Sequence, residues 1–433
     1  MSNFNIILIS IFIFFTIIGV LIFSDVIKVG DRGGRAGATG TVVLWGTVDQ
    51  GTFNTVLDDF NRDNRTFTTQ YVQKNVDTFD DELTDAFASG IGPDLILLPV
   101  RSILSQSDRI FPFPFESFPQ RTFRDSFIQE AELFLSPEGV LALPLTIDPL
   151  VMYYNRNMLD SVGISQPPTT WDEFYTLAPQ LVQIDSSNKI VRSAVALGTF
   201  SNITHAKDII ALLLLQLGNP IVTQSEGVFV SLLNSTLDLP VKPAQAALDF
   251  FTDFSNPLDP AYSWNQALPS SIDAFIAGDL AFYFGYASEL FEIQGKNPNL
   301  NFDLVQIPQP RDFLSRTTIG RMSGIAVSKS TTNLTTAFIT AGLMAQPQFS
   351  LQLSTALALP PARRDLLSQA ASGPYMPIFN ASALQSRSWL DPSPEVTDQI
   401  FSDMVDDIVS GRETVGAAIT RASDELDIVL RRL

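Results

Sequence analysis

The acidic side chain with the clearest chemical setting is Asp148. It lies inside the apolar run LALPLTIDPLV, residues 141–151, in which Leu143, Leu145 and Ile147 alternate with smaller or polar residues. Burying a carboxylate costs several kcal/mol unless hydrogen-bond donors satisfy it. Because its apolar neighbours make a solvated surface position awkward, we expect Asp148 to accept hydrogen bonds from a ligand bound in a cleft.

Seven further side chains are candidates for ligand contacts. Aromatic rings present flat apolar faces, whereas carboxylate and guanidinium groups exchange hydrogen bonds with polar ligand atoms. Each of the aromatic candidates falls in a predicted loop and has core packing as its alternative. The acidic candidate precedes a helix, where acids are favoured in any case, and the arginines could donate to hydroxyls or to a ligand carboxylate. The candidates are Trp45, Trp264, Tyr286, Trp389, Asp49, Arg321 and Arg363.

The composition excludes several kinds of chemistry. The chain has no cysteine, so disulfides, thiolate metal sites and cysteine nucleophiles are absent. A single histidine, His205, disfavours serine triads and histidine–zinc sites, and we expect it to cap a helix or lie on the surface. The composition still permits catalysis by a pair of carboxylates, as in glycoside hydrolysis, but no such pair stands out in the sequence. We therefore predict a binding protein, not an enzyme, with no metal and no cofactor.

The formal net charge of −19 argues against a nucleic-acid partner or an anionic lipid surface, since both are bound by clustered Lys and Arg. No run of like charges exceeds a few residues, so neither an acidic tail nor a basic arm is indicated.

Strand and helix patterns alternate after residue 40. Residues 41–46, 67–72 and 94–98 read as strands, and apolar residues at i, i+3, i+4 and i+7 from Phe53 indicate an amphipathic helix after the first. This order predicts a parallel sheet with right-handed crossovers. Ligands bind beyond the carboxyl ends of such strands, so the loop 45–52, with Trp45 and Asp49, is placed toward a crevice.

Two later segments also have clear local signals. After Pro167-Pro168, a threonine at the cap with acids in the first turn marks a helix start, at which Trp171 is expected to be structural. In residues 271–285 the pattern predicts a helix ended by Gly278 and a buried strand, Leu280–Phe284, aimed at a loop. Further helices are predicted at 209–217, 243–254 and 338–346, with two more within 395–430.

Three motifs resemble the sugar-type extracellular solute-binding proteins of ATP-binding-cassette importers, the maltose-binding-protein-like family 1. The run 143–174 is similar to the family's ALP-x-x-x-D-x-L-x-x-YYN and PPTTWDEL patterns with their spacing preserved. Residues 271–285 resemble AFAAGKAAMYIGG, and 320–328 resemble GG-x-x-LAVSK. Many family members carry a sugar-stacking Trp shortly after the glycine of the second motif. This chain has Tyr286, Ala287 and Ser288 there instead.

The resemblance implies an α/β fold with two lobes, the periplasmic-binding-protein or Venus-flytrap fold. We expect lobe 1 to comprise residues 41–147 and a return segment, 311–355. Lobe 2 is expected to comprise residues 148–310, with the C-terminal helices of 356–433 lying mainly in it.

The resemblance also implies a function: capture of an oligosaccharide or related polyol in the interlobe cleft and delivery to the permease of an importer, by a monomer. Asp148 would accept hydrogen bonds from hydroxyls, and Trp264, Tyr286 and Trp45 would supply ring faces. Two alternatives stay open. One is a membrane-tethered sensor or adaptor with the same fold, and the other is a binder of a non-sugar solute such as an oligopeptide.

Residues 4–23 carry no charge and are long enough to cross a hydrocarbon core of about 30 Å as a helix. They lack the basic start and A-x-A-like exit of a cleaved signal peptide. We therefore expect residues 1–24 to form a retained single-pass anchor in the cell membrane, with the body on the extracytoplasmic side. The glycine-rich residues 25–40 would be a flexible linker.

Overall fold

The computed structural model describes residues 37–187, 189–225, 227–311, 315–369 and 371–432. The chain forms two compact units, which we call unit 1 and unit 2. Unit 1 contains the chain up to Ile147 together with Arg321–Ala371, and unit 2 contains Asp148–Gly320 and Ser372–Leu433. The expected starts of the return segment and of the C-terminal segment, 311 and 356, therefore lie ten and sixteen residues before the observed divisions.

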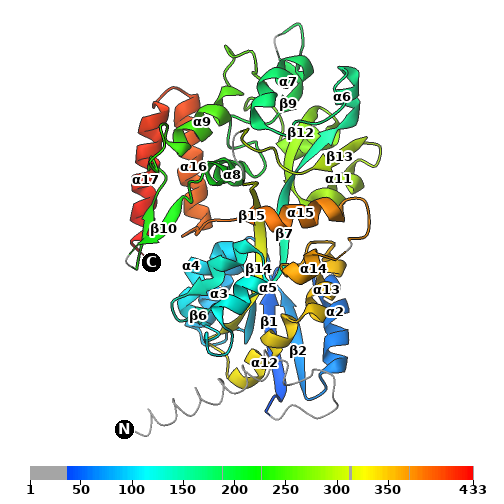
Figure 1. The fold of residues 1–433 in the computed structure, drawn as a ribbon, viewed down its shortest axis with the longest axis vertical. Coiled ribbons are helices and arrows are strands. Elements are labelled where there is room, and N and C mark those ends of the chain that lie inside the picture. The colour runs from blue at the N-terminus through cyan, green and yellow to red at the C-terminus, as the bar shows by residue number, and fades with distance from the viewer. Residues whose placement is uncertain (1–36, 188, 226, 312–314, 370, 433) are drawn as a thin grey trace. The chain divides into compact units, whose positions relative to one another are not determined.

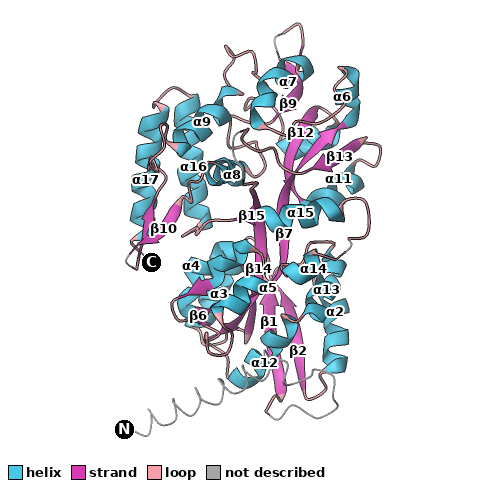
Figure 2. Ribbon diagram, in the orientation of Figure 1, coloured by secondary structure: helices cyan, strands magenta, loops and turns pink. Residues whose placement is uncertain are grey.

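Unit 1 is built on a parallel core of three strands, as the sequence pattern predicts. Strand β1 (Gly40–Gly46) pairs in parallel with β2 (Phe67–Gln73) and with β3 (Leu95–Pro99). Helices α2 (Gln50–Asp63) and α3 (Phe79–Ala88) make the connections, and Figure 2 shows the alternation. The apolar stripe of α2 is buried: Phe53, Val56, Leu57 and Phe60.

A strand from the return segment extends this sheet. The C-terminal part of β14 (Thr318–Ser328) pairs antiparallel with β3, and β14 also pairs with the short β4 (Ile110–Phe111). The remaining elements of unit 1 are α4 (Ile103–Gln106), α5 (Gln120–Ser126), β5 (Leu135–Ser136), β6 (Gly139–Val140), α12 (Leu334–Met344), α13 (Pro347–Leu357) and α14 (Arg364–Leu367).

Unit 2 has a mixed sheet around β7 (Leu143–Asn155), a strand that begins in unit 1 (Figure 1). β7 pairs antiparallel with β12 (Leu280–Tyr286) on one side and with β13 (Phe302–Val305) on the other. The residues of β7 in these two ladders all follow Pro149, because proline has no N–H to donate to a ladder. β12 in turn pairs in parallel with β9 (Ile190–Val195).

Helices cover this second sheet. The predicted helix start is confirmed, and the structure adds a capping box there, with Thr170 and Glu173 bonded reciprocally at the turn that leads into α7 (Phe174–Leu181). The other elements of unit 2 are α6 (Arg156–Ser161), β8 (Gln183–Ile184), α8 (Ala206–Gln216), β10 (Val222–Ser225), β11 (Val228–Ser231), α9 (Pro243–Asp253), α10 (Ser271–Ala277), α11 (Leu290–Lys296), α15 (Met376–Gln385), β15 (Ser386–Arg387), α16 (Pro394–Val409) and α17 (Val415–Leu430).

Within the described part of the chain, no helix is long and apolar enough to cross a membrane. The predicted anchor, residues 1–24, and most of the predicted linker lie outside the described residues.

Candidate functional site

Asp148 is the first residue of unit 2 and lies on β7, half-buried. Its Oδ1 accepts a hydrogen bond from the backbone N–H of Ser288 at 3.0 Å. Ser288 belongs to a 3-10 turn, Ala287–Glu289, that joins the end of β12 to α11. The acidic group in the apolar run is thus next to the loop in which the chain departs from its family resemblance.

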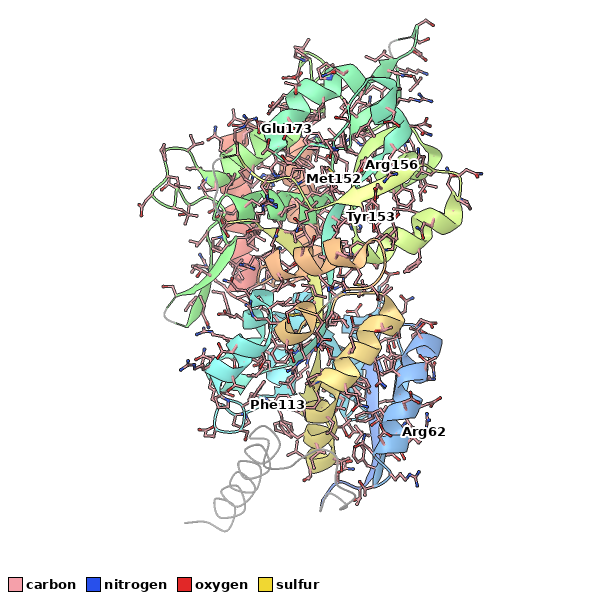
Figure 3. The ribbon with its side chains drawn as sticks, turned by 45° about the vertical axis from the view of Figure 1, so that its right-hand side comes forward. Arg62, Phe113, Met152, Tyr153, Arg156 and Glu173 are labelled. Carbon is pink, nitrogen blue, oxygen red and sulfur yellow. The ribbon has the colours of Figure 1, made fainter. Side chains whose placement is uncertain are left out.

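A buried network holds this loop. The Glu289 carboxylate accepts the Tyr283 hydroxyl at 2.8 Å and the Tyr286 backbone N–H at 3.2 Å. It also pairs with Nε2 of His205, and the two side chains are only 13% and 12% exposed. Burial, with Glu289 as a second cause, raises the pKa of the Tyr283 phenol well above its usual value. Tyr153 of β7, labelled in Figure 3, donates its hydroxyl to the Tyr286 carbonyl at 2.8 Å.

His205 differs from the expectation of a capping or surface residue. It occupies the N-cap position of α8 but makes no side-chain cap hydrogen bond. Its ring is largely buried against Glu289 and meets the Tyr286 ring edge-on, with centroids 4.8 Å apart. The ring pairs with Glu289, which lies 84 residues later in the sequence, so no local sequence pattern predicts this contact.

Three of the aromatic candidates lie in the core of unit 2. Trp264 is 0% exposed, Tyr286 1% and Trp389 5%. The Trp389 ring stacks on Phe401 of α16 at a centroid distance of 6.1 Å. With their faces covered by protein, these rings pack the unit, which corrects the expectation that they present stacking surfaces.

The polar atoms of two buried rings are also satisfied internally. The indole N–H of Trp264 donates to Oδ1 of Asn202 at 3.1 Å, and the Tyr286 hydroxyl donates to Oδ2 of Asp208 at 2.7 Å. Buried polar groups in proteins are normally paired in this way. Both rings therefore have structural partners that explain their presence.

In unit 1, Asp49 follows the carboxyl end of β1, as the strand order predicts, whereas Trp45 is the second-last residue of that strand and not part of the expected loop. Trp45 is half-buried, and the Lys74 ammonium lies 3.7 Å from its ring centroid in a cation–π contact. Asp49 is exposed and caps α2 by accepting the Thr52 backbone N–H at 2.8 Å. The hydrogen bonds from Thr52 lower the pKa of the Asp49 carboxyl.

The two arginine candidates occupy different surroundings in unit 1. Arg363 pairs with Asp365 at 2.9 Å, donates to the Ala345 carbonyl at 3.1 Å and lies over the Phe127 ring. These contacts fix its guanidinium within the protein. Arg321 is exposed on β14.

Sequence reasoning missed Phe291 of α11. Its side chain is 59% exposed, whereas the neighbouring Leu290 and Ile293 are buried. Phe291 comes three residues after Ser288, whose backbone N–H binds Asp148. The sequence did contain a signal. Leu290 and Ile293 are three residues apart and form the buried stripe of α11, so Phe291, between them in the sequence, lies off that stripe.

Two cavities lie within the single units, and the predicted site residues line neither. One, of about 340 Å³, is in unit 2 and is bordered by Gln294, Asn297, Pro298, Leu300, Asn301, Phe302 and Tyr375. The other, of about 410 Å³, is bordered by residues of α2 and α13 in unit 1.

The chain matches a known protein family. Residues 55–377 match a family that is described as "bacterial extracellular solute-binding protein". The chain belongs to this family. Its members are binding proteins by description, and their name places the body outside the cytoplasm.

The curated relatives match a shorter part of the chain. A binding protein of Brucella abortus (strain 2308) is 26% identical over 140 residues, which are 31% of this chain and 33% of the relative. A binding protein of Brucella suis biovar 1 matches to the same extent. The chain thus spans about a third of the length of the curated relatives it matches.

Solved structures match nearly the whole chain. The cyclic α-maltosyl-1,6-maltose binding protein of Arthrobacter globiformis is 16% identical, with 92% of this chain and 100% of that chain covered and a TM-score of 0.75. The sugar-binding protein MalE of Xanthomonas citri is 17% identical, with 90% and 98% covered and a TM-score of 0.73. UgpB of Mycobacterium tuberculosis, solved with glycerophosphocholine, is 16% identical, with 91% and 99% covered and a TM-score of 0.70. At these identities the likeness establishes the two-lobed α/β periplasmic-binding-protein fold.

Proposed function

We propose that the protein captures a carbohydrate, an oligosaccharide or related polyol, outside the cytoplasm and delivers it as a monomer to the permease of an ABC importer. The observation that carries the proposal is the half-buried Asp148 carboxylate, which accepts the Ser288 N–H in the turn that leads into α11, the helix that carries the exposed Phe291. Carbohydrate recognition uses such a mixture of polar groups that bind hydroxyls and flat faces that cover C–H groups.

Within unit 1, we propose Trp45, Asp49 and Arg321 as further solute contacts. Trp45 is the second-last residue of β1, and the Asp49 carboxylate lies beyond the carboxyl end of that strand, the place where α/β sheets bind ligands. The Lys74 ammonium over the Trp45 ring donates one hydrogen bond to Glu82 at 2.9 Å, and its remaining N–H groups are donors that a hydroxyl-rich solute can use. We assign Arg363 to the interior of unit 1 because Asp365, Ala345 and Phe127 already engage its guanidinium.

The neighbours support a carbohydrate more than another solute. Structures with the same fold include sugar-binding proteins from Arthrobacter globiformis and Xanthomonas citri, and also a protein bound to glycerophosphocholine. A thermal-shift screen of oligosaccharides, polyols, glycerophosphodiesters and oligopeptides separates these classes. A solute at 100 times its dissociation constant adds about 2.7 kcal/mol to the free energy of unfolding. A shift by non-carbohydrates alone would overturn the sugar assignment.

Replacing Asp148 by alanine should weaken binding of the solute found in that screen by one to two orders of magnitude. Hydrogen bonds to a charged group contribute about 1.5–3 kcal/mol, and about 1.4 kcal/mol is a factor of ten in affinity. Phe291→Ala should weaken binding by a smaller factor, up to about tenfold, since aromatic contacts contribute about 0.5–1.5 kcal/mol. Isothermal titration calorimetry measures both effects.

Two matched controls accompany these variants. Asp160→Ala removes an exposed carboxylate of α6, and Leu258→Ala shortens a side chain that is 92% exposed. Neither should change the dissociation constant. An Asp148→Ala variant that binds like wild type would remove the central contact of the proposal.

We also propose that residues 4–23 form a single-pass membrane anchor that is retained in the mature protein. Their uncharged, apolar composition supports this, because about 20 such residues span a bilayer as a helix. Mass spectrometry of the protein purified from the membrane fraction should find peptides that precede residue 25. A mature chain that starts at or after residue 25 would contradict the proposal.

A further inference from the structure

Glu289 joins three elements of unit 2 through a single buried carboxylate. One oxygen, Oε1, pairs with His205 at the start of α8. The other, Oε2, accepts the Tyr283 hydroxyl of β12 at 2.8 Å and the Tyr286 backbone N–H at 3.2 Å. The turn Ala287–Glu289 is thereby tied to β12 and α8.

The residue just before Glu289 is Ser288, whose backbone N–H reaches Asp148 at 3.0 Å. Any shift of the Glu289 carboxylate therefore moves the donor that faces Asp148. Space around the carboxylate is tight, since a Cβ added at Gly285 would lie 2.3 Å from Oε2. The glycine at this position is explained by that close approach, because its φ is not in the left-handed region.

His205 supplies the compensating donor and is held in an unusual backbone conformation. Its φ of 65° lies in the left-handed region, which few non-glycine residues adopt. Such conformations persist where surrounding contacts determine them, and they gather at functional sites. The contacts here are the Glu289 carboxylate and the edge-on Tyr286 ring.

Two further carboxylates act on residues of this cluster. Asp208 of α8 accepts the Tyr286 hydroxyl, while Asp148 and Glu289 both help to raise the pKa of Tyr153, after burial as the main cause. A buried carboxylate in this setting is costly without a donor that carries or shares positive charge. His205 and Glu289 are thus a matched pair.

We propose that Glu289, paired with His205, is a positioning residue that holds the Ser288 N–H on Asp148 and so preorganises the solute-binding surface of unit 2. The inference rests on the function proposed above. Preorganisation raises affinity because the apparent dissociation constant equals the intrinsic constant divided by the populated fraction of the competent state. A loop that is ordered a tenth of the time would bind about ten times more weakly.

Amide hydrogen exchange in the unliganded protein tests this directly. Glu289→Ala should raise the exchange rate of the Ser288 amide about tenfold or more, and Glu289→Gln, which keeps an acceptor oxygen, should restore most of the protection. Glu292→Ala is the control: Glu292 lies on α11, the helix that follows the turn, and it is exposed and pairs with Lys296 one turn later. It should leave Ser288 exchange unchanged. Unchanged Ser288 exchange in Glu289→Ala overturns the proposal.

Affinity for maltotriose as probe is the second readout. Glu289→Ala should weaken the affinity about tenfold, and the affinity of Glu289→Gln should stay closer to that of the wild type. A purely structural role of Glu289 would lower the melting temperature of the variants without this order of affinities. If Glu289→Ala does not fold, Gly285→Ala perturbs the same carboxylate and should raise Ser288 exchange. If wild type fails to bind maltotriose, the function proposed for this sugar is in error, while Ser288 exchange still decides whether Glu289 positions the loop.

Discussion

Replacing Trp264 by alanine should lower the stability of unit 2 by about 3–5 kcal/mol and leave solute affinity unchanged. The indole is fully buried, and its N–H donates to Asn202 at 3.1 Å. Truncating a buried tryptophan loses its transfer free energy and leaves a cavity, which together account for a cost of this size. For a unit of this length the melting temperature should fall by roughly 10 °C, measurable by calorimetry and by the urea midpoint.

The affinity measurement separates packing from stacking. A ring that stacks on the solute would weaken binding about tenfold when truncated, even at a temperature where the variant is folded. Trp45→Ala is the matched comparison, because the Trp45 ring is only half-buried and the Lys74 ammonium lies over one of its two faces. Trp45→Ala should lower the free energy of unfolding less than Trp264→Ala does, and it should weaken solute binding more. The reverse order would assign the solute contact to Trp264.

Local patterns in the sequence predict much of the fold. The apolar stripe from Phe53 to Phe60 is buried as expected, and Gly278 ends α10 with φ 87° before the buried strand β12. The predicted helix start after Pro168 also forms, with a threonine at the cap and acids in the first turn. In each case the residues that determine the structure lie within a few positions of one another, so periodicity and cap chemistry are sufficient.

The candidate site is harder to predict, because its contacts join distant parts of the chain. Trp264 falls in a loop between α9 and α10, which made a surface position plausible, but Asn202, 62 residues earlier, holds it in the core. His205 finds Glu289 across 84 residues. Phe291 stands beside buried apolar residues and yet is exposed. Asp148 stands out as a candidate in the sequence because an acid inside an apolar strand is unusual in itself.

Replacing Lys207 by methionine should destabilise unit 2 by about 3–5 kcal/mol at neutral pH, the usual cost of removing one partner of a buried ion pair. The Lys207 ammonium, near the start of α8, lies 3.2 Å from Oδ2 of Asp391, and the side chains are 13% and 6% exposed. It also donates to the Pro394 carbonyl and the Thr397 hydroxyl at the start of α16, at 2.8 and 3.1 Å. The lysine therefore ties two helices together around one buried carboxylate.

The pH dependence has a defined sign. Burial raises the pKa of Asp391, and Lys207 opposes that shift. Without the ammonium the pKa should rise further, so the variant is most destabilised where Asp391 is ionised. A carboxyl whose pKa is higher in the folded state than in the unfolded state gains relative stability as pH falls. The difference in unfolding free energy between Lys207→Met and wild type should therefore shrink on acidification.

A double variant identifies the cause of this loss. Lys207→Met/Asp391→Asn removes both charges but keeps an oxygen that can accept the hydrogen bonds from Thr397 and from the Ser393 N–H. Because a buried pair replaced on both sides is often close to neutral in stability, the double variant should recover most of the loss. Urea denaturation at neutral and acidic pH measures all three proteins. A single variant as stable as wild type, or a double variant no better than the single one, would show that the α8–α16 connection does not depend on this charge pair.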